Sequence, residues 1–336
     1  MESIVTDTLQ SQDSRTYWLQ NLNTLKDTCS ETTFFRVLKN LCLEGLEAQN
    51  SIKSFLGNLE VPLSNQVYFV QFLYNFSVGN CPHLELAEAL LPQVQATKET
   101  IKHIVMLLHN ITIAYKHKLE SLTRKHSRII KAALSFSKED QETFEWLFYL
   151  LSKTVPQNIR VFFEVLETQE LKELIEIIEQ NLQKTWENHQ SLFESTNILC
   201  LSVADLEFLG SKLPEYPYLV HLLSVVSREA PSNQQVKETL TSSALEQCYN
   251  LVQMDLENCQ KTSALQLIAN TMPENLPAAE LAEVHLLPLL KSSAIDPRNP
   301  FTREWVTVIL KLLIPLKPQL AEKITQLKEK RYKDNH

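Results

Sequence analysis

Four asparagines occupy comparable places in apolar segments of the chain. Each follows Leu or Ile by two positions, and the four are Asn40, Asn75, Asn110 and Asn270. The first three are 35 residues apart, and the fourth lies 160 residues further on, or four units of 40. A carboxamide donates and accepts hydrogen bonds, so a row of asparagines on successive helices can hold the main chain of an extended peptide. Alternatively, each asparagine bonds to a nearby helix end within the protein.

No motif in the sequence identifies a catalytic or metal site. The chain has no Gly-rich phosphate loop, no His-Glu-x-x-His or Gly-x-Ser-x-Gly motif, and no zinc-ligand spacing among its cysteines and histidines. The nine histidines are scattered. We therefore expect a protein that is not an enzyme, and we assign no catalytic, cofactor-binding or metal-binding residue.

Composition favours an all-helical protein. Only four of 336 residues are glycine, which leaves little for phosphate loops or tight hairpins, and 44% hydrophobic residues suffice for a sizeable core. The segments Phe34–Leu38 and Tyr68–Leu73 are apolar nearly all round, as inner helices packed between neighbouring repeats must be. Gly45 and Gly210 each follow an apolar helical run, where we expect a left-handed cap at the end of a helix.

The formal net charge of -8 argues against nucleic acid as the main partner, because phosphate binding needs a basic surface. Two basic stretches interrupt this balance, one between Lys116 and Lys131 and one formed by Lys328, Lys330, Arg331 and Lys333. A solvated helix face explains both, and an acidic protein partner or a membrane surface is left open for them. Glutamates at every third position from Glu164 to Glu179 form an acidic surface that favours solubility.

Cysteine usage and hydropathy favour a cytoplasmic protein. The six cysteines form no Cys-x-x-Cys pair, and most lie inside apolar runs, where a thiol packs as a small hydrophobic group. No run approaches the roughly 18 apolar residues that a membrane span requires, and the first residues do not resemble a secretion signal.

The segment from Ile295 to Leu312 predicts a loop that leads into a helix. Asp296 favours a turn, Asn299 is a good N-cap, and Pro300 suits the first helical position. Helical spacing then places four apolar side chains on one face, with Glu304 away from it: Phe301, Trp305, Ile309 and Leu312. We expect this helix to be mainly structural, with Phe301 and Trp305 in the core.

This segment resembles the C-terminal signature of the ataxin-10 family, in which an acidic loop, Asn-Pro-Phe and Glu-Trp open a late armadillo-type helix. Three further segments resemble the same family in the same order, Phe35–Ile52, Val70–Asn75 and Leu265–Asn270. The chain departs from the family at Val308–Leu313, where an Arg-Asn-Leu ending is usual, and at its two late prolines. The resemblance implies that Asn40, Asn75, Asn110 and Asn270 form a peptide-binding ladder.

Repetition and resemblance together predict an all-α, right-handed superhelical solenoid of armadillo/HEAT-like repeats. We expect one solenoid over residues 1–336. Its predicted parts are N-terminal repeats at 1–155, a connecting helical segment at 156–190, and C-terminal repeats at 191–336 that include the signature at 260–331.

The predicted function is a non-catalytic scaffold or adaptor that binds proteins along its concave surface. The ataxin-10 resemblance implies roles in cytokinesis, neurite growth, neuronal survival and cilium or basal-body assembly, O-GlcNAc transferase as a partner, and perinuclear, midbody or centrosomal sites. Self-association is left open. The alternatives are a regulator of an enzyme or small GTPase, and a transport adaptor of the importin type, which the presence of only four tryptophans disfavours.

Overall fold

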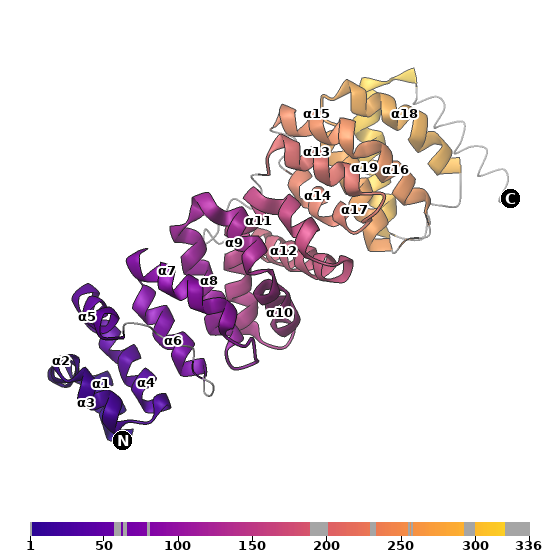
Figure 1. Cartoon of the computed structure of the whole chain (residues 1–336). Coiled ribbons are helices and arrows are strands. Elements are labelled where there is room, and N and C mark those ends of the chain that lie inside the picture. Colours follow the sequence, from indigo (N-terminus) through magenta and orange to yellow (C-terminus); the bar gives the residue numbers. More distant parts are fainter. Residues whose placement is uncertain are drawn as a thin grey trace. The chain divides into compact units, whose positions relative to one another are not determined.

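The structure is a computed structural model that describes residues 2–56, 62, 66–78, 81–188, 201–228, 233–254, 256, 258–291 and 300–319. Every regular element within these residues is an α-helix or a short 3₁₀-helix (Figure 1). The chain divides into two compact units, unit 1 at Met1–Leu171 and unit 2 at Lys172–His336. This division falls inside the segment 156–190 that the sequence analysis assigns to a connection.

Unit 1 begins with three short helices and continues as helices that pack in sequence. The elements are α1 (Glu2–Gln10), α2 (Gln12–Gln20), α3 (Leu22–Thr28), α4 (Glu31–Leu41), η1 (Cys42–Glu44), α5 (Leu46–Leu56), α6 (Gln66–Ser77), α7 (Cys81–Leu90), η2 (Leu91–Gln93), α8 (Ile101–Ala114), η3 (Lys116–Lys118), α9 (Leu119–Lys125), α10 (Ser127–Ser137) and α11 (Gln141–Val165). Helix α12 (Thr168–Asn188) spans the boundary between the units.

Unit 2 repeats the same plan. Its described helices are α13 (Val203–Lys212), α14 (Leu219–Ser227), α15 (Gln234–Ser243), α16 (Leu245–Gln253), α17 (Asn258–Thr271), α18 (Leu276–Lys291) and α19 (Pro300–Leu316). Helix α19 begins at Pro300, the position predicted for its first residue, whereas Asp296 and Asn299 lie outside the described residues.

In each unit, one helix of every repeat packs against its counterpart in the next repeat. In unit 1 these inner helices are α4, α6, α8 and α11, and in unit 2 they are α14, α17 and α19. Phe35 of α4 contacts Phe69 and Phe72 of α6, with ring centroids 5.1 Å and 5.8 Å apart. The predicted class, an all-α solenoid of armadillo-like repeats, is confirmed by this stacking.

Local sequence explains where several helices begin and bend. Ser30, Asp140 and Asn233 each accept a hydrogen bond from the backbone of the first turn, which satisfies donors that have no partner in the helix. Gly45 has a φ of 88° and a ψ of -158°, a positive-φ conformation that suits glycine but is not the left-handed helical conformation predicted for it. Helix α11 is kinked at Asn158, two residues after Pro156. Proline has no backbone N–H and so cannot donate the usual helical hydrogen bond.

Gly210 corrects one expectation. It lies inside α13, whose C-cap is Leu213, and therefore does not cap the helix. At Gly210, α13 instead passes close to α15. A Cβ atom at Gly210 would lie 2.6 Å from the Oγ of Ser243 and 2.8 Å from its carbonyl oxygen. The glycine is therefore explained by close helix packing.

This crossing predicts the outcome of Gly210→Val. The added side chain has no room against the backbone of α15, so we expect the free energy of unfolding to fall by about 1–3 kcal/mol. The measurement is urea unfolding followed by circular dichroism. Ser211→Val is the matched control, because Ser211 is exposed on the same helix and bonds only to the Phe208 carbonyl. Equal unfolding curves for the two variants would contradict the close crossing.

Candidate protein-binding surface

The inner helices of unit 1 are largely buried, and each carries a line of accessible side chains. In α4, for example, Val37, Leu38 and Leu41 are fully buried, while Arg36 and Lys39 are partly accessible. Accessible positions recur three or four residues apart, as they must on one side of a helix. We call this set the unit 1 stripe: Arg36, Lys39, Tyr68, Gln71, Tyr74, Asn75, Lys102, His103, Met106, His109, Asn110, Glu142, Glu145, Trp146, Tyr149 and Lys153.

A chain of hydrogen bonds crosses three helices within the stripe. The Nζ of Lys39 donates to the Oε1 of Gln71 over 3.0 Å, and the Nε2 of Gln71 lies 2.9 Å from the Nε2 of His103. The Gln71 amide can only donate at Nε2, so the imidazole accepts there and carries its proton on Nδ1. Lys39, Gln71 and His103 are 32 residues apart in turn.

Burial lowers the pKa of both titratable side chains in this hydrogen-bonded set, His103 and Lys39. Desolvation is the main cause that lowers the pKa of His103 to about 4, and the charges of Lys102 and Lys39 lower it further. Burial also lowers the pKa of Lys39, and the neighbouring charge of Arg36 acts in the same direction. At neutral pH the stripe therefore presents a neutral imidazole between cationic side chains.

Aromatic rings form the other end of the stripe. The imidazole of His109 on α8 lies 5.7 Å from the Trp146 ring and 6.4 Å from the Tyr149 ring, both on α11. The Trp146 and Tyr149 rings meet edge to face at 5.8 Å. All three side chains are partly accessible, which is the environment in which amphipathic rings serve in protein interfaces.

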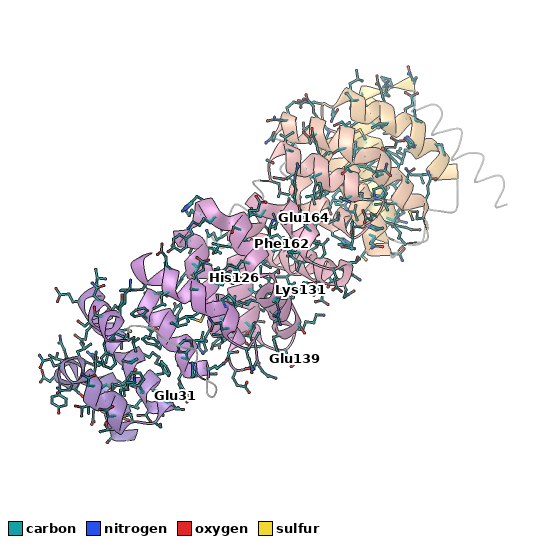
Figure 2. All side chains as sticks on the ribbon, in the orientation of Figure 1. Glu31, His126, Lys131, Glu139, Phe162 and Glu164 are labelled. Atoms are coloured by element: carbon teal, nitrogen blue, oxygen red, sulfur yellow. The ribbon has the colours of Figure 1, made fainter. Side chains whose placement is uncertain are left out.

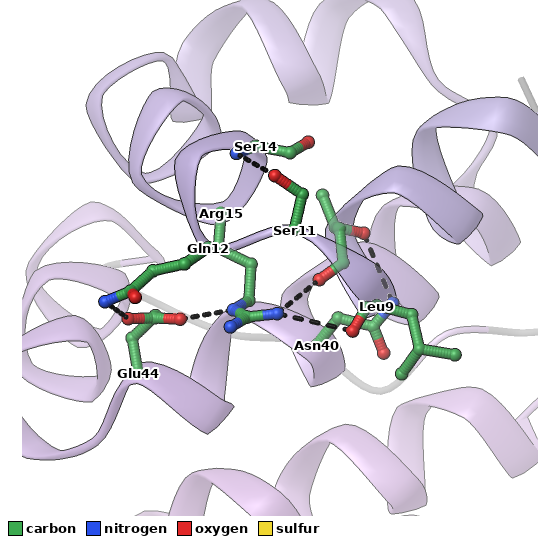
Figure 3. Close-up of polar contacts among 8 residues, drawn as sticks. Leu9, Ser11, Gln12, Ser14, Arg15, Asn40 and Glu44 are labelled. Atoms are coloured by element: carbon green, nitrogen blue, oxygen red, sulfur yellow. Dashed lines mark hydrogen bonds and ion pairs between the residues drawn. The ribbon is translucent and has the colours of Figure 1, made fainter.

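The structure places three of the four predicted asparagines, Asn40, Asn75 and Asn270, in hydrogen bonds to another helix. Asn40 is 3% exposed, and its Nδ2 donates to the Val5 carbonyl over 3.0 Å and to the Thr8 hydroxyl over 3.2 Å. It bonds inside the protein, as the alternative interpretation has it. Figure 3 labels Asn40 among the polar contacts near α1 and α2. The Nδ2 of Asn75 donates to the Lys39 carbonyl over 3.4 Å, a long bond.

The other two asparagines are partly accessible. Asn110 interacts with its neighbour His109, and the Nδ2 of Asn270 in unit 2 donates to the Ser227 hydroxyl over 2.9 Å. Asn75, Asn110 and Asn270 thus lie where a bound peptide could reach them, and their ladder role stays a prediction. A bound peptide could not reach Asn40, because α1 packs over this part of α4 and bonds to the Asn40 amide.

The late helix α19 buries a slightly different side from the one predicted. Val306, Ile309 and Leu313 are buried, whereas Trp305 is partly accessible. Glu304 is exposed as expected. The side chain of Phe301 lies outside the described residues. Ile309 is thus buried as predicted, but its buried companions are Val306 and Leu313, each one residue after the predicted Trp305 and Leu312, which are only partly buried.

The basic stretch from Lys116 to Lys131 is matched by carboxylates of the same chain, whereas the one from Lys328 to Lys333 lies outside the described residues. Arg124 pairs with Glu164 and Glu120, Lys125 pairs with Glu88, and Lys131 pairs with Glu170 over 2.9 Å. Figure 2 labels Lys131 and Glu164 among the side chains of this region. Exposed pairs of this kind contribute little to stability. They link the basic stretch to α7, α11 and the part of α12 that belongs to unit 1.

The described part of the chain has neither a cluster of metal-ligating side chains nor a helix suited to a membrane. No group of three or more His, Cys, Asp or Glu side chains there could hold a metal ion. Among the described helices, none has the length and apolar character to cross a bilayer.

No protein-family model and no curated protein sequence matches the chain. Two solved structures align with it at low similarity. An engineered protein from the Northeast Structural Genomics Consortium is 11% identical, with 92% of this chain and 83% of that chain covered and a TM-score of 0.41. A structure from work on a phosphorylation switch in the interaction between cadherin and β-catenin is 14% identical, with 94% and 72% covered and a TM-score of 0.38. Similarities this low say nothing of function.

The stripe includes residues that the sequence analysis did not select. Gln71, His103, Trp146 and Tyr149 carry no motif, and their significance lies in which helices meet. The offset of 32 residues that joins Lys39, Gln71 and His103 is the one signal that could have found part of the set.

Replacement of Asn40 tests its structural role. Asn40→Ala leaves the buried Val5 carbonyl and Thr8 hydroxyl without this donor, so we expect a loss of about 1–3 kcal/mol of unfolding free energy. Asn110→Ala, at a partly accessible position, should cost clearly less. Thermal and urea unfolding of the two variants measure the difference. Equal stability of both variants would show that the Asn40 bonds contribute nothing.

His126 predicts acid sensitivity. It is 1% exposed at the junction of α9 and α10, neither ring nitrogen has a hydrogen-bond partner in the described residues, and burial lowers its pKa to about 4 (Figure 2). The charge of Lys125 lowers this pKa further, and that of Glu88 opposes the shift. Because the unfolded pKa is about 6.5, the unfolded state binds a proton first as pH falls.

We therefore expect stability that is complete above pH of about 6.5 and decreases as pH falls toward 4. His126→Leu should flatten this decrease in a series of urea unfolding curves. His117→Leu, at an exposed histidine on the neighbouring turn, is the control and should follow the wild type. An unchanged pH slope in His126→Leu would mean that other groups cause the acid sensitivity.

Proposed function

We propose that this chain is a non-catalytic, protein-binding scaffold or adaptor of the ataxin-10 type. The observation that carries the proposal is the unit 1 stripe, in which four successive inner helices expose amide, cationic and aromatic side chains while most of their apolar side chains are buried. A solenoid stacks such lines side by side, and this produces an extended surface suited to a long ligand.

The composition of the stripe supports a protein ligand. Trp146, Tyr149 and Arg36 belong to the residue types that most often dominate binding energy in protein interfaces. Gln71, Asn75 and Asn110 can bond to the main chain of an extended segment, which supplies affinity that does not depend on its side chains.

The wider proposal follows the sequence resemblance. It assigns the chain to cytoplasmic processes of that family, namely cytokinesis, neurite growth, neuronal survival and cilium or basal-body assembly, with O-GlcNAc transferase as a partner. The resembling segments Phe35–Ile52 and Val70–Asn75 contribute Arg36, Lys39 and Gln71 to the stripe. The resemblance and the surface therefore concern the same helices.

The test is the binding of purified O-GlcNAc transferase to immobilised wild-type chain, measured by biolayer interferometry. We expect Trp146→Ala combined with Tyr149→Ala to weaken binding at least about tenfold, because the anchor rings are removed. The matched control replaces Tyr17 and Trp18, another pair of touching rings at 5.1 Å, which lies on α2 and outside the stripe. Melting curves verify that both variants are folded.

Two results would contradict the proposal. Loss of binding in the α2 control alone would place the interface elsewhere. The second result has two parts: no binding of the transferase, and proximity labelling in cells that recovers the same proteins for wild type and for the Trp146 and Tyr149 variant. Together they would refute both the proposed partner and the proposed binding surface.

A further inference from the structure

The unit 1 stripe has a formal charge opposite in sign to that of the whole chain. It contains four cations, Arg36, Lys39, Lys102 and Lys153, and two acids, Glu142 and Glu145, which leaves +2 in a chain of -8. Lys102 pairs with Glu142. Arg36 and Lys39 lie three residues apart on α4, so positive charge gathers at that end. Such a local sign attracts segments of opposite charge.

The hydrogen bonds that join Lys39, Gln71 and His103 also favour a ligand with negative charge or other acceptor groups. Lys39 uses one of its three N–H donors on Gln71, and Gln71 uses one of its two amide N–H donors on His103. The remaining N–H groups of these side chains, including the Nδ1–H of His103, are donors. These donors outnumber the one lone pair left on the Oε1 of Gln71, so acceptors such as carboxylates and main-chain carbonyls match this line best.

The far end of the stripe has a different chemistry. His109, Trp146 and Tyr149 present partly accessible rings on α8 and α11. Four inner helices about 10 Å apart extend over roughly 30 Å, which an extended chain of about nine residues spans. One short segment can thus reach Arg36 at one end and Trp146 at the other.

We propose that the unit 1 stripe binds an extended segment of a partner protein, about nine residues long, with acidic residues over Arg36 and Lys39 and an aromatic or aliphatic residue against Trp146 and Tyr149. This proposal rests on the proposed function and names the chemistry of its ligand. A nucleic acid fits less well, because its continuous phosphates would also meet Glu142 and Glu145, which have the same sign.

The probe is a dye-labelled peptide with acidic residues in its first half and Leu and Phe in its second, and its binding is measured by fluorescence anisotropy. A peptide with Gln and Asn in place of the acids tests the charge, and one with Ser in place of Leu and Phe tests the anchor. We expect the acidic, apolar peptide to bind most tightly and its affinity to fall as salt is raised.

Charge reversal locates the binding site. Arg36→Glu with Lys39→Glu should weaken the peptide at least about tenfold, because like charges then face each other. Arg36→Gln with Lys39→Gln, a milder change that keeps polar side chains, should weaken it several-fold. Lys116→Glu with Arg128→Glu makes the same change in net charge at two exposed positions of the basic stretch and should leave binding within about twofold.

Three outcomes would overturn the inference: equal binding of the neutral peptide, equal weakening in the Lys116 and Arg128 control, or tighter binding of a single-stranded oligonucleotide. The proposed function is separable from it. If O-GlcNAc transferase binding still requires Trp146 and Tyr149 while the acidic peptide does not bind, the surface stands and the ligand chemistry is refuted. If stripe variants change the binding of neither the transferase nor the acidic peptide, both proposals fail.

Discussion

Burial of the apolar sides of the inner helices is the interaction on which the rest of unit 1 depends. Phe69, Phe72 and Phe76 of α6 are fully buried, and Phe35 of α4 packs directly on the first two. Removal of apolar surface from water contributes about 25 cal/mol per Å², so rings of this size dominate the packing energy. An inner helix needs a neighbour on each side to bury them, so the accessible side chains are those that face neither neighbour.

Apolar burial is non-directional, so directed bonds must fix how far each helix slides along the next. Asn40 provides one such bond toward the N-terminal helices, and Gln49 of α5 donates from its Nε2 to the carbonyl of Asn75 at the end of α6. In unit 2, Asn275 donates to the Thr241 hydroxyl over 2.8 Å and accepts from the backbone of Ala278. A shift of one turn would leave these buried amides without partners, at a cost of about 1–3 kcal/mol each.

The sequence predicts the helices better than it predicts their contacts. Runs such as Phe34–Leu38 are apolar on nearly every side, and such a run fits only a helix enclosed by others. In contrast, Gly210 looks the same in sequence whether it ends a helix or lies under a crossing. Its role depends on Ser243, which is 33 residues away.

The same reasoning explains the errors at the site. Successive residues on a helix differ by about 100°, so an apolar run such as Trp305-Val306 fits two neighbouring choices of buried side. The structure selects Val306 because of where the adjacent helices lie. Likewise, Asn40 and Asn110 share one sequence pattern but differ in burial, because α1 covers Asn40.

The hydrogen-bonded chain from Lys39 to His103 has a consequence for binding. Side chains that already hold one another in place lose less rotamer freedom when a ligand binds. This reduces the free-energy cost of binding by about 0.5–1.5 kcal/mol for each long side chain. Lys39 is the clearest case, because its four-carbon stem would otherwise be free to move in water. The bonds that keep neighbouring repeats in register thus also prepare the stripe, since Gln71 serves as acceptor to one helix and donor to the next. A substitution at Gln71 would therefore affect the placement of charge on α4 and of the imidazole on α8 together, even though it removes no charge itself.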